Sequence, residues 1–161
     1  MRCAFTGHRP EKLPWGDQEQ DLRAVALKIQ ITQAVQQAYD RGFRIFACGM
    51  ARGCDHYFAD CVLGFALTHP EVELEAWLPC PSQCELWSEA DQLRYHQTLN
   101  CCARVYTVES SYSPGCMLRR NRAMIDQSDL LISVYDGSGG GTGSAVEYAF
   151  RTGVPVDALW R

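Results

Sequence analysis

Three features are missing from this sequence, and each absence narrows the class of protein. No apolar run approaches the roughly 20 residues that a transmembrane helix needs, so we expect no membrane partner. Met1 to Phe5 lead directly into patterned sequence without signal-peptide architecture, which predicts a cytoplasmic protein. The formal net charge of the 161 residues is only -4, whereas a dedicated nucleic-acid-binding protein usually carries net positive charge. We therefore expect no nucleic-acid partner.

A Cys-x-x-Cys pair is also missing, although the chain has nine cysteines. Only Cys80 and Cys84 have a short spacing like that of two metal ligands. A zinc site that combines them with Cys101 and Cys102 stays open as an alternative, but this spacing matches no zinc template. In a reducing compartment, cysteines within apolar stretches act as small buried hydrophobic residues. We expect no metal, no disulfide and no cofactor.

The composition and the periodicity of the chain predict its fold. Apolar residues make up 47% of the sequence and charged residues 21%, which is typical of a globular protein, and the length fits one domain over 1–161. Strands are predicted at 2–6, 43–48, 72–78, 103–108, 129–135 and 155–159, and helices at 20–41, 55–67, 82–99, 117–127 and 144–151. This alternation predicts a Rossmann-like, doubly wound α/β domain whose mostly parallel sheet is flanked by helices.

Two strands have distinctive patterns. The strand at 72–78 alternates apolar residues with Glu73, Glu75 and Trp77, so we expect one of its faces to be more exposed. The strand at 129–135 is continuously apolar in its middle and is predicted to be buried on both faces.

The loops after the strands hold the candidate functional residues. Right-handed crossovers place all strand-to-helix loops at one edge of a parallel sheet, where ligands bind. We expect Gly7, Gly49 and Gly141 to share this edge. The segments with unusual composition are Thr6-Gly7-His8-Arg9-Pro10, Gly49 to Asp55 (which includes Gly53), Arg119 to Arg122, and Gly139 to Ser144.

The glycine-rich segment gives the clearest prediction. Glycines let the backbone approach an anion closely, and a helix N-terminus supplies free N–H groups at the positive end of a dipole. Thr142 and Ser144 add hydroxyl donors. The alternative is a flexible connection, which we consider the weaker interpretation because the segment joins an apolar strand to a helix. The residues that we expect to hold a phosphate are Gly139, Gly140, Gly141, Thr142, Gly143 and Ser144.

Each of the other candidates has a structural alternative. Arg119, Arg120 and Arg122, with Asn121 between them, form either a solvated helix face or a group of which at least one arginine binds an anion. His8, between Gly7 and Arg9, either packs or contacts a ligand.

The two acidic candidates also have alternatives. Asp55 either caps a helix or lies in the binding site. Glu147 lies three residues beyond Ser144. It is either a favourable acid in a first helical turn, or it reaches ribose hydroxyls or an oxocarbenium-like centre.

Taken together, these motifs resemble the SLOG superfamily, which unites the DNA-processing protein Smf/DprA with the LOG phosphoribohydrolases. The opening segment, Phe5 to Gly16, is similar to that of the YpsA-like or YoqJ-like group. Gly49 to Asp55 resembles the G-[LM]-A-R-G-x-D loop of DprA. Arg119 to Arg122 resembles its R-R-N-R element, which in that family contacts single-stranded DNA.

Other segments resemble LOG. Gly140 to Glu147 is similar to its G-G-x-G-T-x-x-E motif, with Ser144 in place of threonine, and the resemblance implies catalytic roles for Arg120 and Glu147. Two further residues depart from the LOG pattern, because Asn121 replaces a lysine and Gly139 a proline.

The resemblance implies a nucleotide or nucleotide-derived small molecule as the ligand. Our leading hypothesis is a nucleotide-binding protein or sensor that holds phosphate on Gly139 to Ser144. The alternative is LOG-like N-glycosidic cleavage of a nucleoside monophosphate, in which Glu147 stabilises the cationic sugar and Arg120 orients the ligand. A weaker alternative is DprA-like binding of single-stranded DNA through the arginines. Assembly into a homo-oligomer stays open.

Overall fold

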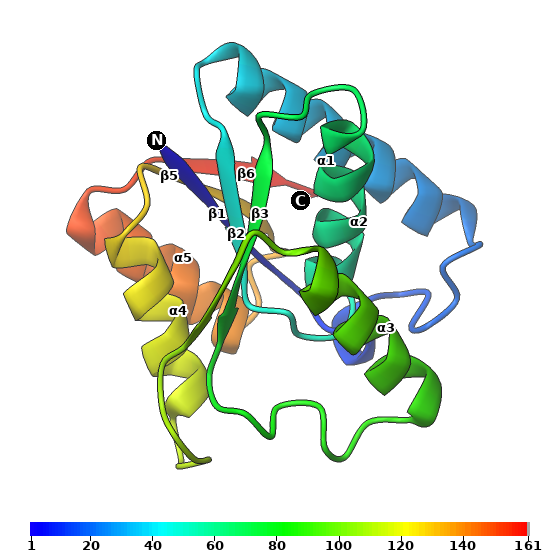
Figure 1. Ribbon diagram of the computed structural model, residues 1–161, viewed down its shortest axis with the longest axis vertical. Helices are drawn as coiled ribbons and strands as arrows, with labels where there is room; N and C mark the ends of the chain where they lie inside the picture. Colours follow the sequence, from blue (N-terminus) through cyan, green and yellow to red (C-terminus); the bar gives the residue numbers. More distant parts are fainter. Residues whose placement is uncertain (161) are drawn as a thin grey trace.

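Strands and helices alternate along the whole chain in the computed structural model, which describes residues 1–160 (Figure 1). The strands are β1 (Arg2–Gly7), β2 (Ile45–Cys48), β3 (Glu73–Leu78), β4 (Arg104–Thr107), β5 (Leu130–Val134) and β6 (Val156–Leu159). The helices are α1 (Leu22–Asp40), α2 (Cys54–Ala66), α3 (Glu89–Cys101), α4 (Cys116–Asp126) and α5 (Gly141–Thr152), with a 3-10 turn at Pro10–Lys12.

The six strands form one sheet in the order β4-β3-β2-β1-β5-β6, and all neighbouring pairs are parallel. Helices α1, α2 and α3 cover one face, and α4 and α5 cover the other (Figure 1). The predicted Rossmann-like α/β fold is confirmed, and the sheet is entirely parallel.

Apolar side chains on both faces of the sheet explain the two helical layers. On the larger side, Phe5 stacks on Phe58 of α2 with ring centroids 4.4 Å apart, within a cluster that includes Leu27 and Ile31 of α1. On the other side, small residues such as Ala4 let α4 and α5 pack close to the sheet. Strand β5 is buried along its whole length, as its apolar sequence predicted.

The strand order creates a crevice at one edge of the sheet. β1 lies between β2 and β5, and the chain leaves β1 and β5 towards helices on opposite faces. Ligands bind at such switch points in open α/β sheets. Gly7 ends β1, Gly49 follows β2, and Gly141 begins the helix after β5. These three glycines therefore share the carboxyl edge of the sheet, as expected.

Helices α3 and α5 begin well away from their predicted first residues, whereas the starts of the others differ by only one or two residues. Helix α3 begins at Glu89 rather than near Ser82, because the Ser88 side chain caps it by accepting a hydrogen bond from the Asp91 N–H. Helix α5 begins at Gly141, three residues before the expected Ser144. The glycine-rich segment is therefore partly helical.

The exposed face expected for β3 is wrong. Glu75 is 0% exposed, with its carboxylate 2.7 Å from Arg2 Nε and 3.4 Å from Arg104 Nη1. Trp77 Nε1 donates to the same carboxylate at 3.4 Å. The alternating pattern indicated exposure, but two arginines and an indole satisfy the charge in a strand that has neighbours on both sides.

The nine cysteines are all free. Cys80 and Cys84 are buried, whereas Cys101 is exposed, and residues 1–160 contain no group of three or more His, Cys, Asp or Glu side chains arranged for a metal ion. The absence of zinc in the purified protein stays a prediction. In the same part of the chain, no helix is both long and apolar enough to cross a membrane.

Candidate functional site

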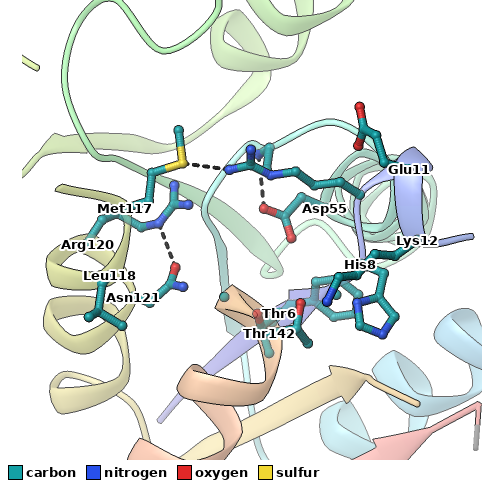
Figure 2. A pocket seen from close by; sticks show the side chains of 15 residues that line it. Thr6, His8, Glu11, Lys12, Asp55, Met117, Leu118, Arg120, Asn121 and Thr142 are labelled. Carbon is teal, nitrogen blue, oxygen red and sulfur yellow. Dashed lines mark hydrogen bonds between the residues drawn. The ribbon is translucent and has the colours of Figure 1, made fainter. Parts of the chain in front are cut away.

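A cavity of about 410 Å³ lies at the carboxyl edge of the sheet, at the crevice between β1 and β5. Its walls come from the end of β1 and the loop after it, the start of α2, the first turns of α4 and the N-terminus of α5 (Figure 2). The lining residues that the sequence predicted are Thr6, Gly7, His8, Arg9, Asp55, Arg120, Asn121, Gly141 and Thr142. Four segments that are distant in the sequence thus meet in one place.

The N-terminus of α5 forms one wall of the cavity. Gly140 is the N-cap, so the N–H groups of Gly141, Thr142 and Gly143 precede the first intrahelical hydrogen bond, from Ser144 N to Gly140 O. The side chains of Thr142 and Thr6 lie close together in Figure 2, and both residues are less than 10% exposed. Within residues 1–160 neither hydroxyl is hydrogen-bonded. Free N–H groups beside two unpaired hydroxyls suit an anion.

The loop after β1 holds the glycine-rich segment in place. His8 is buried, with Nε2 3.0 Å from Asp136 Oδ1, and Asp136 also accepts from Ser138 N at 2.9 Å. The hydrogen bonds from Ser138, together with His8, lower the pKa of Asp136. Lys12 Nζ donates to Ser138 Oγ at 3.3 Å and to the Gly139 carbonyl. These contacts fix the position of the α5 N-terminus relative to β1.

Arg120 lies at the deep end of the cavity and is 3% exposed. Its Nη1 donates to the Gly49 carbonyl and, at 2.9 Å, to the Trp77 carbonyl, while Nε donates to Asn121 Oδ1 at 2.8 Å. A Cβ atom on residue 49 would lie 2.3 Å from Arg120 Cζ, so any larger residue there would displace the guanidinium. The side chain therefore links α4 to the ends of β2 and β3.

Asp55, 5% exposed, lies across the cavity from Arg120 in the first turn of α2. It is not the N-cap, because Gly53 occupies that position, but its Oδ2 accepts from the Ala51 N–H at 3.0 Å and so stabilises the loop before the helix. Burial raises the pKa of Asp55 to about 6, against the opposing effect of Arg120 and, less strongly, of Arg9. The site thus contains a carboxyl group that titrates near neutral pH.

This pKa predicts a pH dependence of stability. Because the folded-state pKa is raised, the folded protein binds more protons between pH 4 and 6 than the unfolded chain, so Asp55 destabilises the fold as pH rises through this window. The full effect is on the order of 3 kcal/mol. In Asp55→Asn, urea unfolding from pH 4 to 7 should show less loss of stability with rising pH than the wild type. Parallel curves for the two proteins would contradict the shift.

Arg9 is the cation of the cavity that lacks an oxygen partner. Lys12 is bonded to the glycine-rich segment and Arg120 to backbone carbonyls, whereas within residues 1–160 the only hydrogen-bond acceptor of the Arg9 side chain is the thioether sulfur of Met117. A thioether is a weak acceptor. An anionic ligand can therefore take the Arg9 guanidinium without breaking an ion pair.

Two of the predicted arginines lie outside the cavity. Arg119 Nε donates to Glu109 Oε1 at 2.5 Å, and its Nη2 donates to Ser113. Arg122 lies over the ring of Tyr148 at 5.3 Å. Helical periodicity explains the division, because Arg120 shares the inward face of α4 with Met117 and Met124 while Arg119 and Arg122 face elsewhere.

Glu147 is also outside the cavity, although it lies near part of the glycine-rich segment, as expected. It is exposed and lines a separate open hollow on the other side of the α5 N-terminus. Helix α5 begins three residues early, so Glu147 is not in the first turn, and it is rotated by about 140° from Thr142 around the helix axis. The residues that share this hollow are Gly139, Gly140, Gly143 and Ser144, with Tyr135, Gly137, Val146 and Phe150.

Gly53, the last of the predicted site residues, borders the cavity only indirectly. It is the N-cap of α2 and does not line the cavity. It lies against the loop after β1 and so helps to position that loop relative to the helix.

Sequence reasoning missed several lining residues. Met117 and Leu118 form an apolar part of the wall, and Glu11 and Lys12 lie at the rim. The remaining two are Phe5 and Ala51. Lys12 could have been found, because it follows the same loop as His8 and Arg9. Met117 carries no charged group or hydroxyl that would have marked it as a candidate.

The sequence of this chain matches a known protein family. The model of the YspA SLOG family matches residues 3–151. The SPbeta prophage-derived protein YoqJ of Bacillus subtilis (strain 168) is 31% identical over 128 residues, which cover 72% of this chain and 74% of that protein. The UPF0398 protein BH1768 of Halalkalibacterium halodurans is 26% identical over 112 residues, covering 68% of this chain and 59% of that protein.

Two solved structures share the fold. DNA processing protein A from Helicobacter pylori, whose single-stranded DNA binding mode has been described, has a TM-score of 0.65 at 17% identity. DprA from Streptococcus pneumoniae has a TM-score of 0.61 at 17% identity. The alignments cover 100% and 98% of this chain but only 66% and 49% of those chains.

The family match extends over most of the sequence, and the fold agrees with that of DprA. The chain belongs to the YspA SLOG family.

Proposed function

We propose that this protein binds a nucleotide in the cavity between β1 and β5, with a phosphate group at the N-terminus of α5. The observation that carries the proposal is the wall formed by the Gly141 and Thr142 backbone and the unpaired hydroxyls of Thr6 and Thr142, in a cavity that the Arg9 guanidinium also lines. Backbone N–H groups, hydroxyls and an arginine are the donors that phosphate oxygens require.

The rest of the cavity suits the remainder of a nucleotide. Its volume, about 410 Å³, lies in the range of small-molecule sites. Met117 and Leu118 offer an apolar surface for a base, while the deep end is polar. Membership of the SLOG family supports a nucleotide-related ligand.

The protein binds the nucleotide without hydrolysing it. Glu147, the carboxylate that the resemblance to LOG assigns to hydrolysis, is outside the cavity. Single-stranded DNA is the rival ligand, because the similar protein from Helicobacter pylori binds it. The positions of Arg119 and Arg122 argue against DNA as the ligand, because these arginines contact Glu109 and Tyr148 and do not line the cavity.

Two glycine substitutions test the phosphate position as a matched pair. A Cβ atom on Gly141 or on Gly139 would meet nothing within 4 Å, but only Gly141 lines the cavity. Gly141→Asp should weaken nucleoside monophosphate binding by about 10- to 100-fold, since it places a carboxylate where the phosphate binds. Gly139→Asp adds the same charge outside the cavity and should change affinity by less than about 3-fold. Calorimetric titration measures both.

The same titration separates the rival ligands. Equal effects of the two substitutions would refute the phosphate position. If a short single-stranded oligonucleotide binds more tightly than any mononucleotide, with a steep dependence on salt, DNA is the ligand instead. Free base released during the titration would show a hydrolytic activity, and its loss in Glu147→Gln would restore the role assigned to that residue.

A further inference from the structure

At the deep end of the cavity, the Asp55 carboxylate can accept hydrogen bonds and the Arg120 guanidinium can donate them. Asp55 uses Oδ2 to accept from Ala51 N, and an ionised carboxylate has about four acceptor positions, so it retains acceptor capacity towards the cavity. Arg120 uses Nη1 and Nε for its hydrogen bonds. Within residues 1–160 its Nη2 donates to no group, although a guanidinium has five N–H donors.

These two side chains are fixed before any ligand arrives. Arg120 is tied to two backbone carbonyls and to Asn121, and Asp55 to the loop before α2. They come from helices on opposite faces of the sheet and point into the same space in Figure 2. No direct ion pair within 4.0 Å joins them in the described residues, although both line the same cavity.

The chemistry of the pair restricts the group that fits. A phosphate is disfavoured beside the Asp55 carboxylate, and an apolar group would leave both side chains unpaired in a buried place. A hydroxyl group donates one hydrogen bond and accepts others, so it satisfies both partners at once. In a nucleotide whose phosphate lies at α5, the groups of this kind are the ribose hydroxyls.

We propose that Asp55 and Arg120 bind the ribose hydroxyls of the ligand and make the site selective for ribonucleotides over 2'-deoxyribonucleotides. This inference rests on the proposed function and names the substrate class of the same cavity. Without the 2'-hydroxyl, a deoxyribonucleotide leaves a buried charged group without its partner. Sites that hydrogen-bond a substrate hydroxyl reject analogues that lack it, and for a charged partner we expect a preference of roughly 10- to 100-fold.

The test compares each of the four ribonucleoside monophosphates with its 2'-deoxy counterpart by calorimetric titration at pH 7.5. The wild type should prefer the ribose form for whichever base binds. In Asp55→Asn the preference should fall by at least about 3-fold relative to the wild type, since the amide removes the charge but keeps the size and leaves Arg120 in place. Loss of a negative charge strengthens the binding of both ligands equally, so their ratio isolates the hydroxyl contact.

Asp60→Asn is the matched control, because Asp60 lies on the same helix but its side chain is 53% exposed and pairs with Arg94 outside the cavity. It should keep the wild-type ratio. Equal affinity for ribose and deoxyribose forms in the wild type, with Gly141→Asp still disruptive, would overturn the inference and leave the proposed function intact. A preference in Asp55→Asn as large as that of the wild type would also overturn it, since Asp55 would then not be a partner of the hydroxyl. If no nucleotide binds, the proposed function fails as well.

Discussion

Arg120→Met should lower the free energy of unfolding by roughly 3–5 kcal/mol, one of the two largest effects that we expect. The substitution keeps the length of the side chain but removes the donors for the carbonyls of Gly49 and Trp77. It also leaves Asp55 buried without the positive charge that opposes the rise of its pKa. The pKa of Asp55 should therefore rise above 6, and the loss of stability should be greatest at neutral pH, where the carboxylate is ionised.

Arg119→Met provides the control from the adjacent residue. Its ion pair with Glu109 is at the surface, so urea unfolding should show little or no loss of stability. The double variant Asp55→Asn/Arg120→Met should recover part of the stability, because it removes the uncompensated carboxylate. If Arg119→Met and Arg120→Met were equally stable, the structural role of Arg120 would be wrong.

These two arginines show how far the sequence predicts the site. The run Arg119 to Arg122 indicated that at least one arginine binds an anion but left open which one. Periodicity within α4 directs only Arg120 and Asn121 towards the cavity, and this requires the register of the helix relative to the sheet. The structure adds that most of the hydrogen bonds of Arg120 go to the protein itself.

The fold could be predicted more completely than the site, and for a physical reason. Alternating strand and helix patterns are local properties, and parallel crossovers then determine which edge carries the loops. The burial of Glu75 depends on residues that are distant in the sequence, and the position of Glu147 depends on the exact residue at which α5 begins. Glu75 is buried because Arg2 and Arg104 compensate its charge from other strands. Glu147 faces away from the cavity because a helix starts within a glycine-rich segment, where sequence gives little indication of the first helical residue.

The second large effect on stability is expected at Gly53, because this residue lies where the loop after β1 contacts the start of α2. Its φ of +86° and ψ of -125° suit glycine, and a Cβ atom there would lie 2.8 Å from the His8 carbonyl oxygen and 2.9 Å from Pro10 Cδ. The same carbonyl accepts a hydrogen bond from Cys54 N at 3.1 Å, which joins the loop after β1 to the start of α2. Gly53→Ala should therefore cost about 2–4 kcal/mol in unfolding free energy, since it combines backbone strain with displacement of this loop.

The same change at Gly64 should have the opposite sign. Gly64 lies within the same helix, is exposed, and a Cβ atom there meets nothing within 4 Å, so Gly64→Ala should stabilise the protein by up to about 1 kcal/mol. Because the displaced loop carries Arg9 and follows directly after Thr6 and Gly7, Gly53→Ala should also weaken nucleotide binding at temperatures where the variant is still folded, whereas Gly64→Ala should not. Urea unfolding and calorimetric titration of both variants measure the two effects. A Gly53→Ala protein as stable as the wild type would mean that α2 can begin without the left-handed residue, and that the β1 loop is not held against it.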